Sequence, residues 1–132
     1  MSSCSTRTLR RGAVPVALLL CLTSAVRADE VTDWHEHMLT SIVTAASNPL
    51  VSGRDAALVS AAMFDAVNGI ERRYAPIYVT ADAPRGASKR AAAVEAAYTI
   101  LVSRYPAQVT DLNAKRSTSL AAIADSGPSG ES

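Results

Sequence analysis

The chain has 132 residues, a formal net charge of +1, and an apolar fraction of 48% with few aromatic residues (5%). Its length allows one small domain. Four of its thirteen basic residues fall within the first 28 positions, which leaves nine basic against twelve acidic residues afterwards, a net charge of −3. At that balance, nucleic acid and anionic lipid surfaces are poor candidate partners. Both cysteines also lie in the first 28 positions, so the remaining chain has no thiol for a disulfide or a metal site.

Residues 1–28 are typical of a secretory signal peptide. Arginines precede an apolar run, and Val26 and Ala28 supply the small residues that signal peptidase requires. The apolar run covers about ten residues, short of the roughly 20 needed to span a bilayer, so we expect no stable membrane span after cleavage. A short anchor that stays attached is the alternative. Arg10-Arg11 is compatible with the twin-arginine route as well as the Sec route. We therefore expect a periplasmic or secreted protein.

Apolar side chains recur every three or four residues in the rest of the chain, which predicts an all-α fold of about four helices. We expect these helices over residues 31–46, 52–72, 88–105 and 107–124. Asn48-Pro49 should end the first helix, and a capping box that begins at Ser52 should open the second. The connector over residues 73–86 contains prolines and one possible short strand, at residues 77–80.

The predicted organisation is a signal peptide (residues 1–28), a helical region (29–124) and a flexible tail (125–132). Alanine fills many of the apolar positions of the helical region. Helices of that composition bury little area each, so a lone domain built from them is only marginally stable.

No catalytic or metal site is predicted from the titratable residues. The only histidines, His35 and His37, point about 200° apart on a helix and cannot share a metal ion. We expect His35 to pack at the edge of the apolar stripe and His37 to lie on the surface. The acidic residues at the start of the first helix favour its dipole, a structural role that accounts for Asp29, Glu30, Asp33 and Glu36.

Polar residues gather on one side of the predicted second helix, opposite its large apolar side chains. They are Arg54, Asp65, Asn68 and Arg72. One interpretation is the solvated face of an amphipathic helix. The other is a polar network that meets another part of a larger protein, because small and apolar residues share that side.

Several stretches of the sequence resemble the start of bacterial vanadium-dependent haloperoxidase-like proteins, which belong to the type 2 phosphatidic acid phosphatase superfamily. The resemblance covers about residues 30–124. Its most specific part is Ala61-Ala62-Met63-Phe64-Asp65-Ala66-Val67-Asn68, and Val31-Thr32-Asp33-Trp34, Ala45-Ala46-Ser47-Asn48-Pro49 and Tyr105-Pro106 add to it.

The resemblance implies a helical bundle that holds vanadate or phosphate in a basic pocket. In that family lysine, arginine and serine-glycine amides grip the oxyanion, one histidine attacks phosphorus or coordinates vanadium, and a second histidine acts as acid and base. The motifs that carry these groups are Arg-Pro and Ser-Gly-His, and both are missing here, as is any histidine after His37. We therefore assign no catalytic, cofactor-binding or metal-binding residue and no cofactor to this chain; vanadate is implied only for a full-length relative.

The expected function is that of an N-terminal, non-catalytic fragment of an exported vanadium haloperoxidase-like or acid phosphatase-like protein. The parent activity is peroxide-dependent halide oxidation or phosphoester hydrolysis, so whether this chain belongs to an enzyme depends on residues beyond it. We expect the helices to be an incomplete part of a larger bundle, with self-association or missing C-terminal helices covering their apolar surface. The alternative is a free-standing small helical envelope protein that binds a protein partner through its second helix.

Overall fold

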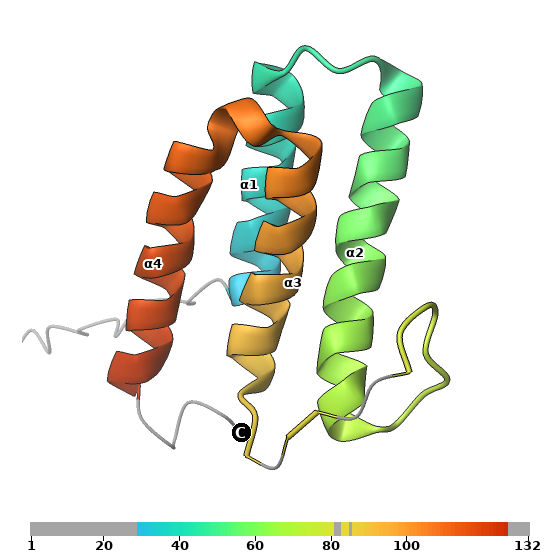
Figure 1. Cartoon of the computed structure of the whole chain (residues 1–132), viewed down its shortest axis with the longest axis vertical. Coiled ribbons are helices and arrows are strands. Elements are labelled where there is room, and N and C mark those ends of the chain that lie inside the picture. Colours follow the sequence, from blue (N-terminus) through green and yellow to red (C-terminus); the bar gives the residue numbers. More distant parts are fainter. Residues whose placement is uncertain (1–28, 81–82, 85, 127–132) are drawn as a thin grey trace, which may run out of the picture.

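The computed structural model describes residues 29–80, 83–84 and 86–126, and these form four α-helices and one short 3-10 helix without any strand (Figure 1). The predicted all-α fold is confirmed. The helices are α1 (Glu30–Thr44), α2 (Pro49–Glu71), α3 (Lys89–Arg104), η1 (Pro106–Gln108) and α4 (Val109–Ser126). None of them is long and apolar enough to cross a bilayer, within the part of the chain described. The predicted signal peptide, residues 1–28, lies outside that part.

The start of α2 differs from the prediction. Asn48 is its N-cap, and the Asn48 Oδ1 accepts hydrogen bonds from the backbone N–H groups of Leu50 and Val51, both at 3.1 Å. Pro49 takes the first helical position, where a missing N–H costs nothing. The predicted capping box at Ser52 is wrong, because Ser52 lies inside the helix and its hydroxyl donates to the backbone oxygen of Asn48 at 2.9 Å.

Helix α3 is the centre of the bundle. It packs against α1, α2 and α4, and Figure 1 shows α2 and α4 on its two sides. Small residues let the helices approach closely, since Ala93 and Ala97 of α3 are buried in the core. The largest fully buried side chain is Trp34 of α1. The other apolar core residues are Met38, Val59, Met63, Val94, Leu101, Tyr105 and Leu112.

Ion pairs join α3 to its neighbours at the rim of this core. Arg90 of α3 forms two hydrogen bonds with Glu30 at the start of α1, and this contact lowers the pKa of the Glu30 carboxyl. Arg116 of α4 pairs with Glu95 of α3 and lies 5.0 Å from the ring centroid of Tyr98. The expected helix-dipole role therefore does not fully account for Glu30, because its carboxylate also links α1 to α3.

Candidate functional site

Asp65 of α2 binds the backbone of the segment that follows the helix. Its Oδ1 accepts a hydrogen bond from the N–H of Ile77 at 2.7 Å, and its Oδ2 accepts from the N–H groups of Tyr78 and Val79 at 2.7 and 2.9 Å. Asp65 is only 5% exposed. The three N–H groups, that of Ile77 above all, stabilise the ionised carboxyl and lower its pKa. The carboxylate thus holds three consecutive residues against α2.

Asn68, one turn further along α2, fixes the same segment at a second point. Its side-chain amide donates to the carbonyl oxygen of Tyr74 at 2.8 Å, and its Oδ1 accepts from the N–H of Tyr74 at 2.9 Å. The short strand predicted at residues 77–80 is wrong, because the N–H groups that would pair with a neighbouring strand bind Asp65 instead. The side chains of the fixed segment remain largely in solvent, with Tyr74 66% and Tyr78 79% exposed.

These contacts bear on the first of the two interpretations of the polar side of α2, and a contact with another part of a larger protein stays a prediction. The solvated face is wrong for Asp65 and Asn68, which are buried and form a polar network with this chain's own residues 74–79. The solvated-face interpretation is correct for Arg54, which is exposed. Arg72 is also exposed and ends α2 in the left-handed conformation, at φ 55°, with its N–H bonded to the backbone oxygen of Asn68.

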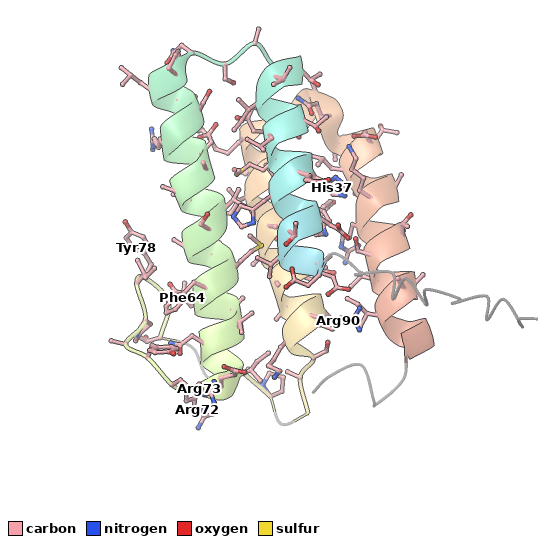
Figure 2. The ribbon with its side chains drawn as sticks, turned by 180° about the vertical axis from the view of Figure 1, so that it is seen from behind. His37, Phe64, Arg72, Arg73, Tyr78 and Arg90 are labelled. Atoms are coloured by element: carbon pink, nitrogen blue, oxygen red, sulfur yellow. The ribbon has the colours of Figure 1, made fainter. Side chains whose placement is uncertain are left out.

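A groove runs between α1 and α2, beside the fixed segment. Its volume is about 320 Å³, and its lining includes Val31 of α1, Met63 and Val67 of α2, and the rings of Phe64 and Tyr74. Those two rings lie 6.1 Å apart between centroids and form one wall. In Figure 2, Phe64 lies between α2 and the segment that carries Tyr78. The groove therefore offers a mostly apolar surface with aromatic walls.

The groove's main polar contact joins the two helices. His35 Nδ1 lies 2.7 Å from the carbonyl oxygen of Val31, to which it can only donate, and Nε2 lies 3.0 Å from the hydroxyl of Ser60. This order of hydrogen bonds is that of a base beside a nucleophile. The rest of the lining is mainly apolar, so we assign the pair a structural role, as expected for a histidine packed at the edge of the stripe.

Asp55, a buried acidic residue, joins α2 to the end of α3. The sequence pattern does not indicate its partners. Asp55 is 1% exposed; its Oδ1 accepts from Arg104 Nε at 2.8 Å and its Oδ2 from the Tyr105 hydroxyl at 2.7 Å. Burial, and the neighbouring Asp55 carboxylate, raise the pKa of the Tyr105 hydroxyl. Asp55 stands three residues after Ser52, at the acidic position of the predicted capping box, yet its partners lie 49 and 50 positions away.

His37 is not the surface residue that the helical pattern predicts. It is half-buried, and its ring meets the ring of Trp34 edge-on at 5.3 Å. Helix α4 flanks this side of α1, and His37 lines a cleft of about 410 Å³ together with Asp33, Lys115 and Ser119. Burial chiefly, and then the ammonium group of Lys115, lower the pKa of His37. The folded chain therefore disfavours the charged imidazolium relative to the unfolded chain.

The described part of the chain offers an apolar groove, and several of its charged side chains are paired with one another. Among the described residues, no three histidine or acidic side chains are placed to hold a metal ion. Four of the described cations, Lys89, Arg104, Arg116 and Lys115, each face a carboxylate rather than a shared oxyanion pocket. These residues therefore do not fit vanadate. Comparisons of the chain with known family models, with curated proteins and with solved structures found no match.

Proposed function

We propose that this chain forms the N-terminal, non-catalytic helical region of an exported vanadium haloperoxidase-like or acid phosphatase-like protein. The parent protein would oxidise halides with peroxide or hydrolyse phosphoesters, using residues that this chain does not contain. The role of the chain would be that of a scaffold, with its own core and with exposed apolar side chains that contact other parts of the parent protein.

One observation carries the proposal. The stretch that gives the resemblance its most specific part contains two polar residues, Asp65 and Asn68, and both are buried and hydrogen-bonded to backbone atoms of the following segment. A carboxylate that accepts three N–H groups has most of its acceptor sites occupied and is stabilised in its ionised form, which makes it poorly suited to acid–base work. These two polar residues thus serve the architecture, which supports a scaffold role.

An activity assay tests the non-catalytic part of the proposal. The purified protein, incubated with vanadate, should oxidise no bromide or chloride in the presence of peroxide, and without vanadate it should hydrolyse no phosphoester. A halide oxidation rate that depends on vanadate would contradict the proposal, since it would require a working oxyanion site within this chain. A full-length haloperoxidase assayed in parallel shows that the conditions would have detected activity.

A second candidate function is that of a free-standing helical envelope protein that binds a protein partner. One observation favours it: within the described part, no buried side-chain nitrogen or oxygen lacks a hydrogen-bond partner. Such satisfaction is what an autonomous fold requires. Near-ultraviolet circular dichroism during thermal unfolding separates the two. A sharp cooperative loss of signal at a midpoint that does not depend on protein concentration would favour the free-standing protein, and a midpoint that rises with protein concentration, as for an associated chain, would favour the scaffold.

A further inference from the structure

The second half of α4 is held to the bundle less firmly than its first half. Leu112, in the first half, is fully buried, and Arg116 pairs with Glu95 of α3. Between residues 117 and 124 no side chain is buried, and Ser117-Thr118-Ser119 lowers the helix propensity of that stretch. The second half of α4 can therefore leave the bundle at a low cost in free energy while the first half stays in place.

A hydrogen bond ties this second half to α1. The indole N–H of Trp34 donates to Ser119 Oγ at 3.2 Å, and the Trp34 side chain is fully buried. The ring of His37 stands edge-on to the Trp34 ring, 5.3 Å away between centroids, and points from α1 towards α4 (Figure 2). His37 and Ser119 also line the same cleft of about 410 Å³ between the two helices. The contact between α1 and the second half of α4 thus includes a titratable ring.

The charged groups around His37 do not compensate a charged imidazolium. Burial is the main cause that lowers the pKa of His37, and the ammonium group of Lys115 across the cleft is the second, although Lys115 pairs with Asp111. Glu30, which also lines the cleft, is engaged by Arg90 of α3. The acidic groups that favour the charged ring, and that do not outweigh these causes, are Asp33 and Glu36 on its own helix and Asp111 on α4.

We propose that His37 is a pH-sensitive latch, whose protonation releases residues 117–126 of α4 from α1. Water and a greater distance from Lys115 both stabilise an imidazolium, and the open form supplies both. Between the His37 pKa values of the closed and open forms, each unit of lower pH favours opening by up to about tenfold. Opening exposes apolar surface of Trp34 and Ile123, which pack in and against the core of the closed form. The latch involves only the packing of α4 on α1 and does not depend on the proposed function.

The fluorescence of Trp34, the only tryptophan of the chain, reports on this contact directly. The purified protein is titrated from about pH 7.5 to about pH 5, where histidines change charge before most carboxylates do. We expect the emission of Trp34 to shift to longer wavelength and the indole to become accessible to acrylamide. Backbone amides of residues 120–124 should lose up to about tenfold in protection per pH unit, corrected for the intrinsic exchange rate, while α3 stays protected.

Four variants identify the group that titrates. His37→Gln should abolish the transition, and His35→Gln is the matched control, because the only other histidine contacts Ser60 of α2 and its loss should leave the transition in place. Lys115→Gln should move the midpoint to higher pH and Asp33→Asn to lower pH, since each removes one charge that acts on the imidazolium. These two shifts of opposite sign test the latch independently of how well His37→Gln folds.

A wavelength and an acrylamide accessibility that stay constant over this pH range would overturn the latch. A fall in Trp34 intensity alone would not support it, because a protonated imidazole quenches a neighbouring indole without any opening. A transition that persists in His37→Gln, or that Lys115→Gln moves to lower pH, would assign it to another group. Loss of protection in α3 at the same pH as in α4 would also overturn the latch, since the whole bundle would then unfold.

Discussion

Replacing Asp55 by alanine removes a buried polar link between α2 and the end of α3. A hydrogen bond to a charged group contributes about 1.5–3 kcal/mol. The bond from Arg104 counts at the low end of that range, because its side chain is 34% exposed and regains hydration. The hydroxyl of Tyr105, which is 6% exposed, loses its carboxylate partner in a buried position. We therefore expect Asp55→Ala to lower the free energy of unfolding by about 3–4 kcal/mol.

Urea unfolding followed by circular dichroism measures this loss. Asp111→Ala is the control, because Asp111 is an exposed carboxylate that pairs with Lys115 one turn along α4, and its loss should cost under about 0.5 kcal/mol. Tyr105→Phe should cost about 1–2 kcal/mol alone but little in the background of Asp55→Ala, where the hydroxyl no longer has its acceptor. A loss below about 1 kcal/mol for Asp55→Ala, or additive effects in the double variant, would refute the reasoning.

Three further predictions concern the fixed segment, the cleft and the end of α2. Asp65→Asn replaces one carboxylate oxygen by an NH₂ group that faces backbone N–H groups. Amide hydrogen exchange at Ile77, Tyr78 and Val79 should therefore become faster while α3 stays protected. Exchange rates at these three residues equal to those of the unsubstituted protein would contradict the contacts described. The pKa of His37 is lower in the folded than in the unfolded chain, so the unfolded chain binds more protons and stability should fall as the pH drops below about 6.5. His37→Gln should flatten this dependence in urea titrations between about pH 7 and 5.5, and an unchanged slope would rule His37 out as its source. Arg72→Gly should raise the free energy of unfolding by about 0.5–1 kcal/mol, because glycine adopts the left-handed conformation without strain; a lower thermal midpoint would show that the arginine side chain matters more.

The helices could be predicted from the sequence because their information is local. Apolar side chains at three- and four-residue spacing place α1, α2 and α3 on the core, and Ser88 caps α3 where the sequence predicts its start. The start of α2 was missed for a local reason as well. Two candidate caps, Asn48 and Ser52, stand one turn apart, and only the position of Pro49 after the first of them identifies the one that is used.

The polar contacts could not be predicted, because each depends on residues brought together by packing. The helical pattern correctly places Asp65 on the side of α2 opposite the large apolar side chains. The simplest expectation for a residue on that side is exposure to water. It is buried because a segment without helical or strand periodicity folds back over it, twelve to fourteen residues later. Nothing in the pattern of α2 alone indicates that cover. The burial of His37 likewise depends on a segment distant in sequence, because α4 flanks that side of α1.

The DNA sequence downstream of the codon for Ser132 tests the central claim most directly, because the claim places the chemistry of the parent protein in residues beyond this chain. The scaffold account predicts in-frame or frame-shifted code for the missing Arg-Pro and Ser-Gly-His motifs within a few hundred codons, together with further amphipathic helices. Downstream DNA without either motif in any frame would contradict the account and leave the free-standing helical protein as the better description.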